Sequence, residues 1–185
     1  MSVITVRYAY SDYLALPDNG KRHEIIEGEL FMTPAPGVFH QIILSNVEEI
    51  LRKFVRTNNL GIVLVAPTDV ILSDQDIVQP DLLFIASSRR SIITEKNING
   101  APDLIVEILS ERTRVVDQKQ KRQLYEKYGV KEYWMIDVEE KTVEILTLVQ
   151  GRYASLGVIR DGYIRSQLLQ GLEAALIDVF STKPL

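Results

Sequence analysis

The stretch PDLIVEIL, residues 102–109, places a single carboxylate, Glu107, inside an otherwise apolar run. Its β-branched residues, with a turn-forming Pro-Asp pair before them, predict a short β-strand. Neighbouring side chains of a strand point to opposite faces, so one face carries Asp103, Ile105, Glu107 and Leu109, and the other carries Leu104, Val106 and Ile108. Both faces are mostly apolar, which is typical of a central strand that is covered on both sides.

Glu107 needs a partner in such a strand. An ionised carboxylate that leaves water loses several kcal/mol of hydration unless a cation or a metal lies close to it. The sequence leaves two interpretations open: Glu107 belongs to a functional site, or it lies near the strand end and reaches solvent or an internal salt bridge.

Composition limits the rest of the molecule. The 185 residues are 46% hydrophobic, enough for a sizeable core, and we expect one domain over residues 1–185. Lys and Arg number 21 against 25 Asp and Glu, and the net charge of −4 gives no overall attraction for nucleic acid or membrane. A nucleic-acid partner therefore requires a local patch.

The absence of cysteine excludes disulfides, thiolate zinc sites and cysteine nucleophiles, so we expect a cytoplasmic protein. The N-terminal residues lack the pattern of a signal peptide. The longest apolar run, near LGIVLVAP, is too short to cross a bilayer, and no membrane association is expected.

Hydrophobic periodicity and turn residues predict the other elements. HEIIEGELFMTP predicts a hairpin around Gly28, and a helix is expected from about His40 to Thr57. Further strands are predicted at residues 61–67, 69–72, 78–86, 131–137 and 142–148, with a second helix at residues 115–129 that ends at Gly129 and a final strand or hairpin before a C-terminal element. The order predicts an α/β (mixed α+β) fold, a mixed β-sheet flanked by helices.

The second predicted helix offers a cation to Glu107. Leu124 and Tyr128 mark its apolar stripe, and Lys121 lies on or beside that stripe, so its ammonium is directed toward the sheet. Lys119 points elsewhere on the same helix. The alternative for Lys121 is a side chain whose stem packs while its charge reaches water.

Asp81 follows Pro80 at the entry to an apolar strand. Pro-Asp before a strand is a frequent turn signal, and Pro102-Asp103 repeats it without obvious chemistry. Together, however, an acid opening one strand, an acid inside another and a lysine on the next helix can bind a hard divalent cation and a phosphate.

This ordered set resembles the restriction-endonuclease-like proteins of the PD-(D/E)XK nuclease superfamily, a group abundant in photosynthetic bacteria. The resemblance runs from HEIIEGEL through PAPGVFHQ and VQPDLLFI to EYWMID, and it implies a restriction-endonuclease-like core. It also implies that Asp81, Glu107 and the carbonyl of Ile108 ligate Mg²⁺ (or Mn²⁺). The superfamily's lysine two residues after the second acid is replaced by Leu109. In the subgroup that this chain resembles, the lysine is taken to come from the following helix, so the resemblance implies Lys121 as the catalytic lysine, with Lys119 as the second candidate.

Two further residues match positions of the subgroup. His40 is expected to position water or phosphate, since the pKa of histidine lies near neutrality; the alternative is a histidine that caps its own helix. Glu29 matches another acid that would reach the metal, with a solvated hairpin charge as the alternative.

The resemblance implies metal-dependent hydrolysis of phosphodiester bonds by an endonuclease, with DNA as the expected substrate and a homodimer as the expected assembly. Local charge agrees, because residues 111–131 carry seven basic and three acidic side chains, although this cluster could be a solvated helix face with internal ion pairs. A catalytically inactive nucleic-acid-binding or protein-interaction module on the same fold is the alternative. No phosphate-binding loop, dinucleotide turn, HExxH pair or GxSxG elbow supports another enzyme class.

Overall fold

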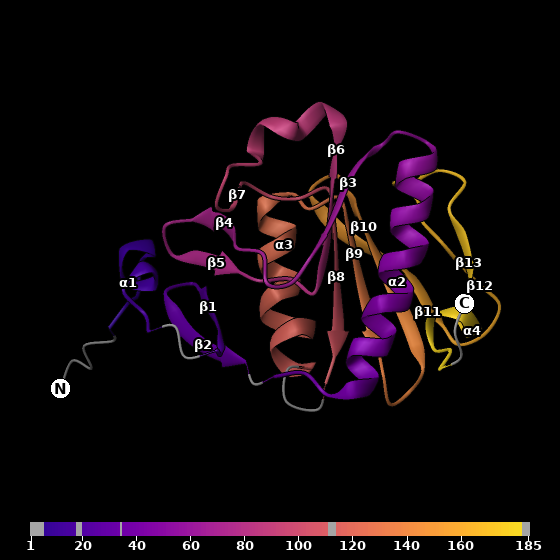
Figure 1. Ribbon diagram of the computed structural model, residues 1–185, viewed down its shortest axis with the longest axis horizontal. Coiled ribbons are helices and arrows are strands. Elements are labelled where there is room, and N and C mark those ends of the chain that lie inside the picture. The colour runs from indigo at the N-terminus through magenta and orange to yellow at the C-terminus, as the bar shows by residue number, and fades with distance from the viewer. Residues whose placement is uncertain (1–5, 18–19, 34, 111–113, 183–185) are drawn as a thin grey trace.

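The computed structural model of the protein describes residues 6–17, 20–33, 35–110 and 114–182. In these residues a six-stranded mixed sheet, here called the central sheet, lies between helices, and a five-stranded sheet, here called the hairpin sheet, lies beside it (Figure 1). The order in the central sheet is β11-β10-β9-β8-β6-β3. The expected mixed sheet with flanking helices is therefore confirmed.

The central sheet is built from the strands with the most continuous apolar runs. Its members are β3 (Gly61–Val65), β6 (Leu82–Ala86), β8 (Leu104–Leu109), β9 (Glu132–Asp137), β10 (Thr142–Val149) and β11 (Arg152–Ile159). Strands β8 and β9 pair in parallel, and the other neighbours pair antiparallel. Every residue of β8 and β9 is buried, as expected for strands covered on both faces.

Each face of the central sheet packs against its own hydrophobic core. Leu104, Val106 and Ile108 of β8 belong to the core beneath α2 (Val38–Thr57). Ile105 and Leu109 belong to the core on the other face, which includes Leu124 and Tyr125 of α3 (Arg122–Tyr128). The predicted alternation along residues 103–109 is thus confirmed, and it places the Glu107 side chain on the α3 face.

The connection from β8 to β9 contains a π-helical segment, η2 (Val116–Lys121), that runs directly into α3. The helix ends at Gly129, whose φ of 79° is the left-handed geometry that glycine adopts without steric cost. The predicted helix and its end are confirmed, whereas the π-helical geometry of its first part was not predicted.

The hairpin sheet has the order β2-β1-β5-β4-β7, with β1 (Arg22–Ile26), β2 (Glu29–Thr33), β4 (Val70–Ser73), β5 (Asp76–Val78) and β7 (Ile98–Asn99). Glu27 and Gly28 connect β1 to β2 with φ angles of 52° and 78°. Two successive positive φ values are those of a type I′ turn, which suits the twist of a two-residue hairpin. The predicted hairpin around Gly28 is confirmed.

The strand predicted at residues 78–86 is divided in the structure. Strand β5 ends at Val78 in the hairpin sheet, and β6 begins at Leu82 in the central sheet. Pro80 interrupts the run because it has no N–H to donate to a ladder. The chain therefore crosses between the two sheets at residues 79–81, which places Asp81 at their junction.

The remaining elements are peripheral. They are α1 (Tyr10–Leu14), a 3₁₀ helix η1 (Ser87–Ile92), the ribbon of β12 (Tyr163–Arg165) and β13 (Glu173–Ala175), and α4 (Leu176–Val179). None of the helices in the described ranges is long and apolar enough to span a lipid bilayer.

Candidate active site

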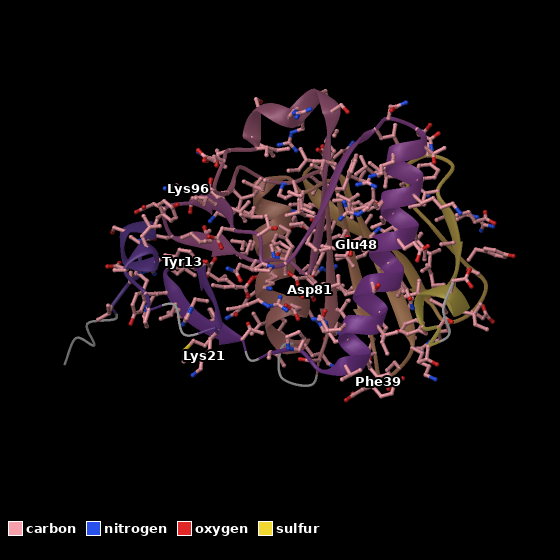
Figure 2. The ribbon with its side chains drawn as sticks, viewed as in Figure 1. Tyr13, Lys21, Phe39, Glu48, Asp81 and Lys96 are labelled. Carbon is pink, nitrogen blue, oxygen red and sulfur yellow. The ribbon has the colours of Figure 1, made fainter. Side chains whose placement is uncertain are left out.

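A cleft of about 790 Å³ opens between the hairpin sheet and the central sheet. Its walls come from the β1–β2 hairpin and the segment up to His40, the crossing at residues 79–81, the end of β8, η2 and the turn after β9. Asp81 lies near the centre of the molecule, while Phe39 lies at the start of α2 and Lys21 beside the hairpin (Figure 2). Parts of the chain that are distant in sequence therefore meet at one cavity.

Asp81 is held by three donors. Its Oδ1 accepts a hydrogen bond from Arg22 at 3.0 Å, and its Oδ2 accepts one from the backbone N–H of Ile108 at 2.9 Å. The third contact joins Oδ2 to His40 Nε2 at 3.0 Å. Burial raises the pKa of Asp81, but His40, Ile108 and Arg22 outweigh that effect and lower the pKa. The carboxylate is thus ionised and can only accept, so His40 carries its proton on Nε2.

Glu107 is 3% exposed and meets the cation that its burial requires. Its Oε1 accepts hydrogen bonds from Lys121 Nζ at 2.9 Å and from the Tyr125 hydroxyl at 2.8 Å. Burial raises the pKa of Glu107 to about 8, against the opposing effect of Lys121. The internal salt bridge that the sequence allowed does form, and it forms at the wall of the cleft.

Lys121 is shared among three carboxylates. Besides Glu107, its Nζ lies 3.0 Å from Glu24 Oε1 and 3.4 Å from Asp117 Oδ1. Burial lowers the pKa of Lys121, but the three carboxylates raise it well above its ordinary value. The ammonium remains charged and is held at one point by groups from β1, β8 and η2.

The buried charges do not balance. The carboxylates of Glu24, Asp81, Glu107 and Asp117 are all 5% exposed or less and line the cleft. Among the lining residues that the structure describes, the permanent cations that are buried or half-buried are Arg22 and Lys121. For these described residues, four negative charges against two positive ones leave −2 when His40 is neutral. A buried excess of this kind is relieved by holding a proton on one carboxyl, as the raised pKa of Glu107 indicates, or by binding a cation.

This donor set fits a magnesium ion. Within the residues that the structure describes, no three His, Asp or Glu side chains converge as a ready metal-binding cluster. Mg²⁺ is commonly bound by one or two carboxylates and completes its coordination with water and substrate phosphates. Asp81 accepts the N–H of Ile108, the residue after Glu107, and both carboxylates line the same cleft, so they supply such a pair.

The structure brings together most of the residues that the sequence singled out. Asp81, Glu107, Ile108, Lys121 and His40 all line the cleft. The ring of His40 contacts Asp81, whereas the N-cap residue of α2 is Gly37 and no side chain caps the helix. The Nδ1 atom of His40 is buried and has no hydrogen-bond partner in the described part of the chain.

Two predicted candidates lie elsewhere. Glu29 is exposed at the start of β2 and Lys119 is exposed on η2, and neither lines the cleft. Glu29 lies outside the cleft because it follows the tight turn, where its side chain faces solvent. The geometry thus favours Lys121 over Lys119.

Sequence reasoning missed Glu24, Asp117, Arg22 and Tyr125 as members of the site. Glu24 forms an ion pair with Lys121 and accepts a hydrogen bond from the backbone N–H of Gln79, which ties the hairpin to the sheet crossing. One signal was available: Arg22 and Glu24 alternate in β1 and therefore share a face.

As far as the structure describes it, the basic cluster at residues 111–131 does not form a positive surface around the cleft. Arg114 pairs with Asp137 and Glu139, Lys127 with Asp76, and Lys131 with Asp103. Lys121 is the member of this cluster that lines the cleft, among the residues described, while Arg112 lies outside the described residues. Internal ion pairing, the alternative considered from sequence, accounts for most of these charges.

Comparison with known proteins gives a family and a similar crystal structure. Residues 10–179 match a family described as "Uma2: Putative restriction endonuclease". A crystal structure described as a "putative nuclease belonging to DUF820 from Anabaena variabilis ATCC 29413" superimposes with a TM-score of 0.78 and 22% identity, covering 93% of this chain and 97% of that chain. No curated protein matches the chain. Because the family match spans most of the sequence, the protein belongs to the Uma2 family, and its fold is restriction-endonuclease-like.

Proposed function

We propose that the protein is a metal-dependent nuclease that hydrolyses phosphodiester bonds, with DNA as its substrate. The observation that carries the proposal is the meeting of Asp81, Glu107 and Lys121 at one cleft whose buried carboxylates exceed its cations. The family description and the nuclease title of the similar structure support the same activity.

Asp81, Glu107 and the carbonyl of Ile108 would hold Mg²⁺ or Mn²⁺. Such an ion, when bound, polarises the scissile phosphate and lowers the pKa of a water molecule. Arg22, His40 and the Ile108 N–H fix the Asp81 carboxylate, so its oxygens need little rearrangement on binding.

Lys121 orients the attacking water and offsets negative charge that develops on the phosphate. Glu24 and Asp117 keep the ammonium beside Glu107, and Tyr125 keeps the Glu107 carboxylate in place. His40 is suited to move a proton, because Nε2 is held by Asp81 while the buried Nδ1 is free to accept.

Cleavage of labelled single- and double-stranded DNA with Mg²⁺ or Mn²⁺ tests the proposal. The natural protein is compared with Glu107→Gln, and Glu29→Gln serves as a control for loss of an acid outside the cleft. We expect metal-dependent cutting that Glu107→Gln abolishes and Glu29→Gln preserves. Cutting that survives in Glu107→Gln would refute the site.

A catalytically inactive nucleic-acid-binding module is the second candidate. Two observations favour it: Lys121 already pairs with three carboxylates, and Leu109 stands where the superfamily carries its lysine. Calorimetric titration with Mn²⁺ separates the two. If the protein is a nuclease, the natural protein binds Mn²⁺ and the Glu107→Gln variant loses that binding. If it is an inactive module, the natural protein binds Mn²⁺ no better than the Glu107→Gln variant does.

By analogy with nucleases that cut two strands with two subunits, we also propose a homodimer that acts in the cytoplasm. Light scattering of the purified chain tests the assembly, and a mass of one chain at micromolar concentration would refute it.

A further inference from the structure

The two acids of the site lie deep. Asp81 is 5% exposed and Glu107 is 3% exposed, so a phosphodiester must enter the cleft to reach them. The cleft volume of about 790 Å³ is that of a pocket for small ligands, roughly 300–1,000 Å³. Duplex DNA is a stiff rod that bends little over a few base pairs. A space of this size admits a short piece of one strand, and a paired second strand would meet the cleft walls.

An exposed apolar rim lies at the mouth of the same cleft. Met32, Val38 and Phe39 line it and are 60%, 75% and 65% exposed. Phe39 directly precedes His40, whose ring contacts Asp81. Large apolar side chains that are exposed together beside a polar site commonly mark a binding surface.

Charge and shape on this rim favour a nucleobase over a peptide or a second copy of the chain. Arg22 and Lys21 lie on the hairpin wall of the cleft, and Arg22 contacts Asp81 at 3.0 Å. Unpaired strands are bound by cations that contact the backbone and by aromatic rings that stack on bases, and Lys21 and Phe39 offer one of each at this rim. Figure 2 shows Lys21 and Phe39 both below Asp81 in this view, Lys21 to the left and Phe39 to the right.

Resting on the proposed nuclease function, we propose that the site takes an unpaired strand and that Phe39 stacks on a base next to the scissile phosphate. The substrate class is single-stranded DNA or the single-stranded arm of a fork. Met32 and Val38, which line the same rim, add apolar contact to that base while its phosphate lies at Asp81 and Glu107.

Cleavage of one labelled strand in three settings tests the substrate class: alone, as an arm of a fork, and within a blunt duplex, all with Mg²⁺. We expect the free strand and the arm to be cut at least about tenfold faster than the duplex, and Phe39→Ala to slow the cutting about tenfold, as loss of one stacked base commonly does. Phe39→Tyr should restore the rate. Tyr163→Ala, which removes an exposed aromatic ring outside the cleft, should leave it unchanged.

A binding measurement keeps this inference separate from the nuclease proposal. In Glu107→Gln protein, stacking of Phe39 should quench the fluorescence of a 2-aminopurine base in a single strand, and Phe39→Ala should remove the quenching. Equal cutting of duplex and single strand, or quenching that is independent of Phe39, would overturn the inference. Phe39-dependent quenching without cutting of any substrate would support the inference and refute the nuclease proposal.

Discussion

The Nζ atom of Lys121 lies 2.9 Å from Oε1 of Glu107, although 14 residues separate them along the chain. The superfamily's lysine lies on the strand of the second acid, where this chain has Leu109. Here η2 and α3 return the chain across the α3 face of the central sheet, and the last residue of η2 brings an ammonium to the same carboxylate. The positive charge beside Glu107 therefore comes from η2 and not from the strand that carries Glu107.

Removal of the Lys121 ammonium should destabilise the fold as well as end activity. Lys121→Met leaves Glu24, Glu107 and Asp117 buried without their shared cation, and loss of one partner of a buried pair costs about 3–5 kcal/mol. Urea denaturation should show this loss in unfolding free energy. Lys119→Met, on the exposed side of η2, should change it by less than about 0.5 kcal/mol.

The double variant Lys121→Met with Glu24→Gln tests the physical reason. Neutralising Glu24 removes one of the carboxylate charges that lose their cation in Lys121→Met, so part of the lost stability should return while cleavage stays absent. A double variant no more stable than Lys121→Met would show that packing, and not charge, explains the effect.

Stability should depend on pH through Glu107. Burial raises the pKa of this carboxyl from its ordinary value of 4.5 to about 8, although Lys121 opposes the shift. The folded protein therefore binds a proton that the unfolded chain releases, and the contribution to stability is lost as pH rises through the folded pKa. Glu107→Gln cannot titrate, so its unfolding free energy relative to the natural protein should rise by about 1 kcal/mol or more between pH 5 and pH 8.5.

Urea denaturation at pH 5, 7 and 8.5 in the presence of a chelator measures this difference. A difference that stays constant with pH would mean that Glu107 is ionised throughout. Saturating Mg²⁺ should flatten the pH dependence of the natural protein, because metal binding releases the proton.

Glu24 and Glu29 offer a matched pair on one hairpin. Glu24 is buried and contacts Lys121 at 3.0 Å, whereas Glu29 is exposed and lies outside the cleft. Glu24→Gln keeps an acceptor for the Gln79 N–H but removes one charge that holds the lysine, so kcat should fall roughly 10–100-fold. Single-turnover cleavage by both variants measures the contrast. An equal loss in Glu29→Gln would restore the metal role that the family resemblance implied for that residue.

The hairpin also contains a site residue, Glu24, that could not be predicted from the sequence. Alternation along residues 103–109 was enough to place Glu107 on the same face as Ile105 and Leu109, because strand geometry dictates it locally, and the structure shows that α3 covers this face. The apolar stripe of the second helix likewise directed Lys121 toward the sheet. Glu24 was missed because its burial depends on the hairpin docking against the crossing at residues 79–81, a contact between segments 55 residues apart. Local pattern carries no information on such a contact.

The division of the strand at residues 78–86 has a similar cause. Apolar residues on both sides of Gln79 and Pro80 fit one strand, and the change of sheet at this point is decided by pairing with β1 and β8, which lie elsewhere in the sequence. The local signal was Pro80 itself, which cannot donate to a ladder.

Asp103 should prove important for stability and not for cleavage. It is fully buried; its Oδ2 accepts the Ala86 N–H at 2.9 Å, and its Oδ1 pairs with Lys131 at 2.8 Å. Asp103→Asn should cost roughly 1–3 kcal/mol, or roughly 2–10 °C in Tm, with cleavage per folded molecule unchanged because Asp103 does not line the cleft.

This loss of stability should depend on pH. Burial opposes ionisation of Asp103, but the Ala86 N–H, Lys131 and Arg89 lower its pKa, so the difference in stability between Asp103→Asn and the natural protein should shrink as pH falls below about 3.8. Thermal denaturation at pH 7 and pH 3 checks both statements, with the exposed Asp161→Asn as control. A loss of cleavage larger than the loss of folded protein would instead extend the site to the opposite end of β8.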